Sequence, residues 1–291
     1  MSFKIITDSS CNLSEEVIDQ LGLEVITLSY IINDEEKKSY VKGQVFDHVE
    51  FYDKLKNKAS ARTSQVTPQQ ATEFFKPILE QGHDVLYIGF SSGLSGTYSA
   101  VCLALEGLKE EFPDRKILTE DTLAASAGMS LIVLKACELR DEGKTMEEIQ
   151  KWIADTKLKV CHYFTVDDLW HLQRGGRLSK GKALVGTVLN VKPILSVNDE
   201  GKLIPIGKAK GRKKSLDHLV EKMEQNIDLA ANSTVFIIHA VAEDDANYLA
   251  QQVKARYKDM ATQFVPLEPV IGCHAGPGVC ALIFIGSKRE N

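Results

Sequence analysis

The chain lacks any long apolar segment. No run of about 18 apolar residues, the length that spans a bilayer, occurs among its 291 residues. Residues 1–5 (MSFKI) enter a strand pattern directly, so we expect no signal peptide. The six cysteines form no C-x-x-C pair, and several lie inside apolar runs. Reduced core cysteines of this kind are typical of a cytoplasmic protein, which is the location we expect.

Positive charge is also scarce. The sequence has 35 Lys and Arg against 40 Asp and Glu, a formal net charge of −5. Nucleic-acid-binding surfaces usually need a basic stripe, so we expect no nucleic-acid partner. One dense basic cluster is present, and it predicts either a solvated loop or a docking patch for an acidic partner. It consists of Lys208, Lys210, Arg212, Lys213 and Lys214.

The motifs of several enzyme classes are absent. The sequence has neither a G-x-x-x-x-G-K-[ST] loop nor a G-x-G-x-x-G turn for a nucleotide. Its histidines show no H-E-x-x-H or paired-ligand spacing, so we expect no metal. The G-x-S-x-G pattern that would begin at Gly93 is incomplete, because Thr97 occupies its last position. A Ser/His pair with Asp8 remains conceivable, although no signature supports it.

What the first half does contain is an alternation of strand and helix signals. At this length, with 44% hydrophobic residues, we expect a globular chain with two domains. Helix caps are indicated where Glu or Gln follows three positions after Asn12, Thr67 and Thr145. Strands are expected at 3–7, 24–30, 85–90 and 116–120. The alternation predicts parallel βαβ units, whose ligand sites lie at the carboxyl ends of the strands.

The pattern changes after about residue 158. Residues 193–197 and 202–206 flank a turn and are expected to form a hairpin. Further helices and strands follow, which indicates a mixed sheet. We therefore predict an N-terminal α/β domain at 1–158 and a C-terminal α+β domain at 159–291.

The most informative feature is the segment 91–98 (SSGLSGTY), which follows a buried strand and precedes an apolar helix. Free backbone N–H groups, the positive end of the helix and several hydroxyls would converge there. Such a turn is a receptor for an anion, for example a phosphate or a carboxylate. The alternative is that Ser91 and Ser92 only cap the helix.

Three further loop clusters are richer in glycine and polar residues than turning the chain requires: 7–10 (TDSS), 63–65 (TSQ) and 271–278 (IGCHAGPG). The first two, with 91–98, are expected where a parallel sheet gathers its ligand-facing loops. The last cluster belongs to the other predicted domain. From this constrained loop His274 could reach the cleft between the domains, although a single histidine in a glycine loop is often incidental.

Seven ordered motifs run through the chain: 7–10 (TDSS), 63–65 (TSQ), 94–98 (LSGTY), 175–178 (GGRL), 192–195 (KPIL), 211–212 (GR) and 274–278 (HAGPG). In these motifs the chain resembles the DegV family of bacterial fatty-acid-binding proteins, which includes the FakB subunit of fatty acid kinase. The resemblance implies a two-domain α/β carrier that buries a lipid carboxylate between its domains. It implies no catalysis by the chain itself and no cofactor apart from the bound fatty acid.

The resemblance also assigns roles to residues. A threonine, a serine and a histidine hold the head group in this family, and they map onto Thr63, Ser95 and His274. Ser95 and Thr63 lie on loops expected at the sheet end, and His274 on the facing domain. The neighbouring residues expected to support this site are Ser64, Gly96 and Thr97.

Family proteins present the bound acid to a separate ATP-dependent kinase, which makes an acyl phosphate. Arg177 and Arg212 match family arginines linked to the head-group region or to kinase docking. A guanidinium would suit an acyl phosphate, because it pairs with phosphate oxygens at two points. Exposed salt bridges are the alternative for both arginines. Gly93 stands where other members often carry a larger residue.

Two rival functions stay open on the sequence. One is a hydrolase or phosphatase that uses Ser95 and His274. The other is a lipid-sensing regulator that binds the same fatty acid. Turnover of an ester would distinguish the hydrolase from a carrier. Only an assay with the partner protein would distinguish the regulator from a carrier.

Overall fold

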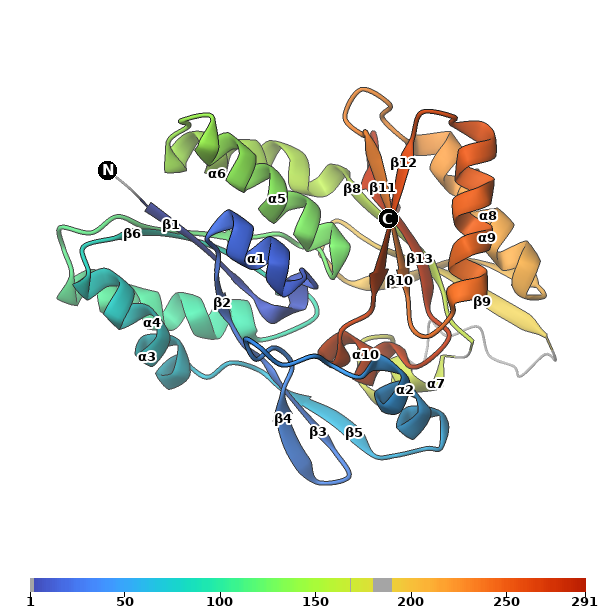
Figure 1. Cartoon of the computed structure of the whole chain (residues 1–291), viewed down its shortest axis with the longest axis horizontal. Coiled ribbons are helices and arrows are strands. Elements are labelled where there is room, and N and C mark those ends of the chain that lie inside the picture. Colours follow the sequence, from blue (N-terminus) through green and yellow to red (C-terminus); the bar gives the residue numbers. More distant parts are fainter. Residues whose placement is uncertain (1–2, 168, 180–189) are drawn as a thin grey trace.

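A computed structural model describes residues 3–167, 169–179 and 190–291 (Figure 1). It contains one parallel and one mixed main sheet with helices packed on them, which confirms the α/β class expected from the sequence. Over these described ranges, no helix is both long enough and apolar enough to cross a membrane. The domain division at 158/159 remains a prediction; it falls within η2 (Lys157–Lys159), directly before the first strand of the mixed sheet.

The parallel sheet has the strand order β2-β1-β6-β7. Its central strands β1 and β6 are rich in Ile, Val and Leu and largely buried, as expected for parallel strands covered on both faces. Figure 1 shows α3 and α4 on one side of this sheet and α5 and α6 on the other. The elements of this layer are β1 (Phe3–Asp8), α1 (Glu15–Leu21), β2 (Glu24–Ile26), α3 (Pro68–Glu80), β6 (Asp84–Gly89), α4 (Thr97–Glu111), β7 (Ile117–Asp121), α5 (Ala127–Asp141) and α6 (Met146–Thr156).

The mixed sheet has the order β10-β9-β8-β13-β11-β12. The predicted hairpin is confirmed as the antiparallel pair of β9 and β10. Helices α8 and α9 pack against each other and against this sheet. The elements of this layer are β8 (Val160–Thr165), β9 (Val191–Val197), β10 (Leu203–Lys210), α8 (Arg212–Asn226), β11 (Thr234–His239), α9 (Glu243–Arg256), β12 (Ala261–Pro266) and β13 (Cys280–Ile285).

A third, small antiparallel sheet was not expected from the sequence. It has the order β4-β3-β5, and its strands are β3 (Ser29–Ile32), β4 (Glu35–Lys38) and β5 (Ala61–Ser64). The single strand predicted at 24–30 is therefore wrong, since β2 and β3 belong to different sheets. The break has a physical cause at Leu28, whose N–H donates to Ser9 Oγ and whose carbonyl accepts from the backbone N–H of Ser39.

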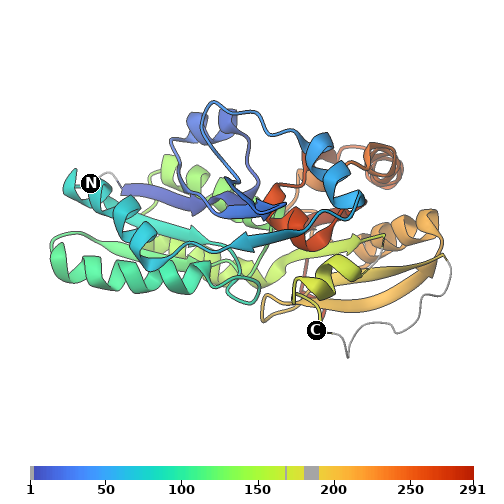
Figure 2. The ribbon, with the colours of Figure 1, turned by 90° about the horizontal axis from the view of Figure 1, so that it is seen from below.

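Three short helices lie where the sheets meet: α2 (His48–Lys56), α7 (Trp170–Arg174) and α10 (Pro269–Ala275). Helix α10 contacts α7, α2 and β5, as Figure 1 and Figure 2 show from two directions. The glycine loop predicted at 271–278 is therefore wrong in its first half, because His274 lies in the last turn of α10.

Two of the three predicted caps are confirmed. Thr67 and Thr145 each form a capping box at the start of α3 and α6. Asn12 does not cap α1, because Ser14 Oγ accepts from the N–H of Val17 at that position. Asn12 instead follows η1 (Ser9–Cys11) with a left-handed φ of 59°, which Asn tolerates better than most residues.

The main apolar core is continuous across the two main sheets. One buried cluster includes Ile5 and Leu86 of the parallel sheet together with Val160 and Ile283 of the mixed sheet. A smaller cluster lies between the mixed sheet and helices α8 and α9. Near the C-terminus the buried Arg289 guanidinium donates to backbone carbonyls of both halves, among them those of Leu123, Lys157 and Val160.

Candidate functional site

A cavity of about 370 Å³ lies where β5, the parallel-sheet loops, the mixed sheet and α10 meet. Its volume falls in the range of small-molecule sites. Most of its lining is apolar, for example Phe90, Phe164, Val270 and Ile283. The polar lining residues are fewer, and they are Thr63, Ser64, Gln65, Ser95, Ser126, His162, Arg177 and His274.

The charge of this lining has one sign only. Arg177 is its single Lys or Arg, and no Asp or Glu is among the described residues that line the cavity. Arg177 Nε donates to the carbonyl of Leu94 at 3.0 Å and Nη1 donates to that of Gly175 at 2.6 Å. Within the described part of the chain it has no carboxylate partner, and burial lowers the pKa of its guanidinium. An arginine without a counter-ion in a partly buried cavity favours an anionic ligand.

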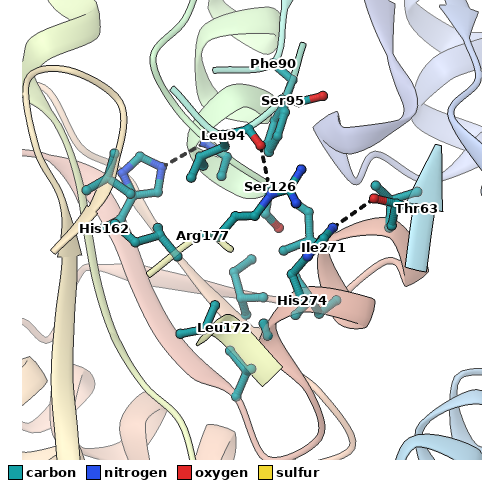
Figure 3. A pocket seen from close by; sticks show the side chains of 18 of the residues that line it. Thr63, Phe90, Leu94, Ser95, Ser126, His162, Leu172, Arg177, Ile271 and His274 are labelled. Atoms are coloured by element: carbon teal, nitrogen blue, oxygen red, sulfur yellow. Dashed lines mark hydrogen bonds between the residues drawn. The ribbon is translucent and has the colours of Figure 1, made fainter. Parts of the chain in front are cut away.

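Thr63 and His274 meet at one side of the cavity (Figure 3). Thr63 Oγ1 and His274 Nε2 are hydrogen-bonded at 2.8 Å. Burial, and then the nearby Arg177 and Arg174, lower the pKa of His274 to about 3, so its ring is neutral at neutral pH. Thr63 lies in β5 of the small antiparallel sheet, and not on a loop at the end of the parallel sheet as predicted.

Ser95 lies in the turn between β6 and α4. Its Oγ donates to Thr97 Oγ1 at 3.0 Å and accepts from the N–H of Thr97 at 3.2 Å. Gly96 is the N-cap residue of α4 and supplies no side-chain cap. The predicted strand–turn–helix arrangement is confirmed, and the positive end of α4 lies beside Ser95. Ser64 also lines the cavity, whereas Gly96 and Thr97 are not among its lining residues, and their supporting role stays a prediction.

The arrangement required by a Ser/His/Asp hydrolase is not assembled. Ser95 Oγ pairs with Thr97, and His274 Nε2 pairs with Thr63. The buried Asp8 carboxylate accepts from the N–H of Phe90 and Ser10 and from the hydroxyl of Tyr87. Among the hydrogen bonds of the described residues, none joins Ser95, His274 and Asp8 to one another.

Arg212 lies outside the cavity. Its Nε pairs with Asp245 Oδ2 at 2.7 Å, and its Nη2 donates to the carbonyl of Gly278 at 2.6 Å. The alternative expected from the sequence was an exposed salt bridge, whereas the salt bridge of Arg212 is partly buried. A docking role for Arg212 stays a prediction. The basic cluster around it is not one solvated loop, because its members lie on β10 and on the first turn of α8.

Two polar lining residues were not identified from the sequence. His162 lies in β8, where its apolar neighbours made it indistinguishable from a core residue. Its Nε2 accepts from the N–H of Ala125 at 3.3 Å, and burial lowers the pKa of the ring to about 3. Ser126, at the start of α5, has a positive φ of 52°, for which the sequence offers no signal. Figure 3 shows His162 on the side of the view opposite Thr63.

Metal ligands are not grouped in the described part of the structure. In these ranges, no set of three or more His, Cys, Asp or Glu side chains could hold a metal ion. The polar groups of the cavity are instead hydroxyls, an amide, two imidazole rings and one guanidinium, set among apolar walls.

Comparison with known proteins extends this description. A family model described as an uncharacterised protein of the DegV family matches residues 2–287. A DegV domain-containing protein of Clostridium perfringens is 39% identical over 290 residues, which cover 99% of each chain. A fatty acid binding DegV family protein of Streptococcus agalactiae has a solved structure with 31% identity, a TM-score of 0.83 and full coverage of both chains.

A second solved structure concerns fatty acid binding of a DegV family protein from Thermus thermophilus. It is 27% identical to this chain, with a TM-score of 0.85, and the match covers 98% of this chain and 100% of that one. The family match and the relatives span nearly all 291 residues. The chain belongs to the DegV family.

Proposed function

We propose that the protein binds one long-chain fatty acid, with the carboxylate held by Thr63, Ser95 and His274 and the acyl chain along the apolar walls. The observation that carries this proposal is the composition of the cavity. Its described lining has one arginine, no acidic residue and a largely apolar wall. This combination suits a ligand with one negative charge and a long hydrocarbon tail. Fatty acid binding by the relatives from S. agalactiae and T. thermophilus supports it.

The head group would be bound mainly by neutral donors. A carboxylate accepts several hydrogen bonds, and the hydroxyls of Thr63 and Ser95 supply two of them once the Ser95 hydrogen turns from Thr97 Oγ1 to the ligand. His274 is neutral, and in this proposal its ring hydrogen lies on Nε2 and is donated to Thr63 Oγ1, which leaves the Thr63 hydroxyl hydrogen for the carboxylate. Arg177 supplies the balancing charge, since its Nη2 makes no hydrogen bond within the described residues while Nε and Nη1 are engaged.

The tail would be bound by burial of apolar surface. Each methylene removed from water contributes about 0.8 kcal/mol, so a long acyl chain supplies most of the affinity. The head group then fixes orientation and excludes uncharged lipids, because unpaired polar groups in the cavity would stay unsatisfied.

We further propose that the loaded protein presents its fatty acid to an ATP-dependent kinase and performs no catalysis itself. In that step a carboxylate oxygen attacks the γ-phosphorus of ATP, an acyl phosphate forms, and ADP leaves. The chain has no nucleotide-binding motif of the common types, so ATP and metal would come with the kinase. The resemblance in the 175–178 and 211–212 motifs supports this part of the proposal. A lipid sensor would bind the same ligand, and an assay with the kinase separates the two.

Titration of delipidated protein tests the binding proposal. Palmitic acid and hexadecanol have the same chain length and differ in charge, so they isolate the contribution of the head group. We expect one palmitate per chain and at least about tenfold weaker binding of hexadecanol. Equal affinity for both would contradict the head-group assignment, and failure to bind either would contradict the carrier function. Hydrolysis of an ester probe would favour the hydrolase instead.

A further inference from the structure

Helix α10 carries His274, and residues from the opposite end of the chain hold the start of this helix. Asn12 Nδ2 donates to the carbonyl of Pro266 at 2.8 Å. Asn12 Oδ1 accepts from the N–H of Glu268, the N-cap residue of α10, also at 2.8 Å. One amide side chain therefore spans the entry to α10, across sequence separations of 254 and 256 residues.

The same amide also reaches a wall of the cavity. Asn12 Oδ1 accepts a second hydrogen bond, from Ser126 Oγ at 3.2 Å. Ser126 lines the cavity and has φ 52° and ψ −133°, an unusual conformation for a residue other than glycine. Asn12 thus connects the element that carries His274 to the turn before α5.

A displacement of the N-terminus of α10 would also displace His274, because both belong to the same short helix. His274 lies six positions after Glu268, which is about 9 Å along the helix axis or fewer than two helical turns, so we treat this segment as one rigid unit. Glu268 stiffens this segment, because its carboxyl oxygens accept from the N–H groups of Val270 and Ile271. On the other side the hydroxyl of Tyr52 donates to the carbonyl of Leu267.

We propose that Asn12 is a positioning residue for the head-group site, which holds α10 so that His274 Nε2 stays in hydrogen-bond reach of Thr63. This inference rests on the proposed function for its effect on lipid binding. Its structural half stands apart from that function, because the pairing of Thr63 with His274 requires no ligand.

The test uses two variants of the full chain. Asn12→Gly removes the amide, and glycine adopts the positive φ of this position without strain. Thr145→Ala is the control, because it removes a capping box at α6, whose residues do not line the cavity. Two readouts are measured for each: the ring ¹⁵N and ¹H chemical shifts of His274 in delipidated protein, and the dissociation constant for palmitate.

We expect Asn12→Gly to change the His274 ring shifts and to weaken palmitate binding about tenfold, since a displaced partner leaves the head group with fewer bonds. Thr145→Ala should lower the melting temperature and change neither readout. Unchanged His274 shifts in a folded Asn12→Gly protein would overturn the proposal. If wild-type protein binds no palmitate but Asn12→Gly still moves these shifts, the positioning role stands and the carrier function fails.

Asn12→Asp serves if the glycine variant does not fold. The aspartate keeps a side-chain oxygen that can accept from the N–H of Glu268, but it lacks the N–H that donates to the carbonyl of Pro266. The His274 shifts should then move in the same direction by a smaller amount, and wild-type shifts in this variant would also overturn the proposal.

Discussion

Thr63 and His274 are 211 positions apart in the sequence, and their Oγ1 and Nε2 atoms lie 2.8 Å apart. Thr63 comes from the small antiparallel sheet, and His274 comes from α10 of the C-terminal half. Because burial keeps His274 neutral, this pair carries no charge, and Arg177 is the one charged residue among the described residues that line the cavity.

Thr63→Val removes one hydroxyl at nearly constant side-chain shape. We expect palmitate binding to weaken by about 1–3 kcal/mol, because the buried carboxylate keeps one bond fewer. Thr262→Val is the matched control, since Thr262 lies in β12, which contributes no residue to the cavity lining. Isothermal titration of both variants checks this, and equal affinities would contradict the role of Thr63.

Ser95→Ala should weaken palmitate binding by a similar amount, about 1–3 kcal/mol, while leaving the fold intact. This substitution also removes Ser95 Oγ as the acceptor for the N–H of Thr97 at the start of α4. Ser99→Ala, at an exposed position of the same helix, is the control for general effects of the substitution. A Ser95→Ala protein with wild-type affinity would remove Ser95 from the head-group site.

Arg177 and Arg212 should behave differently. Arg177 lines the cavity, so Arg177→Met should weaken palmitate binding at neutral pH, whereas Arg212→Met should leave it near the wild-type value. If Arg212 serves kinase docking, its variant should still show slower acyl phosphate formation, which hydroxylamine trapping measures. Loss of binding in Arg212→Met would contradict this separation.

Gly93 marks a close contact between the two halves of the chain. A Cβ atom there would lie 2.4 Å from the carbonyl oxygen of Glu200, in the turn between β9 and β10. Gly93→Ala must displace backbone, so we expect a loss of about 1–3 kcal/mol in the free energy of unfolding. From the sequence, Gly93 was only a position where other family members often carry a larger residue.

Gly107→Ala is the matched control for Gly93. A Cβ atom at Gly107, within α4, meets nothing within 4 Å. Alanine there should raise the free energy of unfolding by about 0.5–1 kcal/mol, because it favours the helix. Urea unfolding of both variants measures these changes. Equal changes in the free energy of unfolding for Gly93→Ala and Gly107→Ala would contradict the close contact at Gly93.

The buried histidines predict a loss of stability in acid. His162 and His274 have pKa values of about 3 in the folded protein, below the ordinary value of 6.5. Between these values the unfolded chain binds protons at these two histidines that the folded protein does not, so their contribution to stability falls as the pH drops from 6.5 toward 3. Each histidine contributes a slope of about 1.4 kcal/mol per pH unit in this window.

His162→Gln tests this slope directly, because glutamine does not titrate. The free energy of unfolding, measured in urea at several pH values from 6.5 to 4, should depend less steeply on pH in the variant than in the wild type. The same steepness in both proteins would contradict a neutral, buried His162.

Local sequence signals predicted much of the fold. The strand at 85–90, the capping boxes at Thr67 and Thr145 and the hairpin of β9 and β10 depend on residues close together in the chain, and all are confirmed. The small sheet was missed because its boundary at Leu28 depends on Ser9 and Ser39, which are distant partners.

The site was predicted less completely. Helix α10 was taken for a loop because it contains Gly272 and is followed by Gly276 and Gly278, although Pro269 at its first position was an available signal. Thr63, Ser95 and His274 came from the family resemblance, and the structure gathers all three around one cavity. Their contact with a carboxylate stays a prediction.

Native mass spectrometry of freshly purified protein, followed by organic extraction and identification of the released material, tests the central claim most directly. We expect one long-chain fatty acid per chain, and its identity would also give the preferred chain length. A protein that is empty and also fails to take up added palmitate would contradict the carrier function.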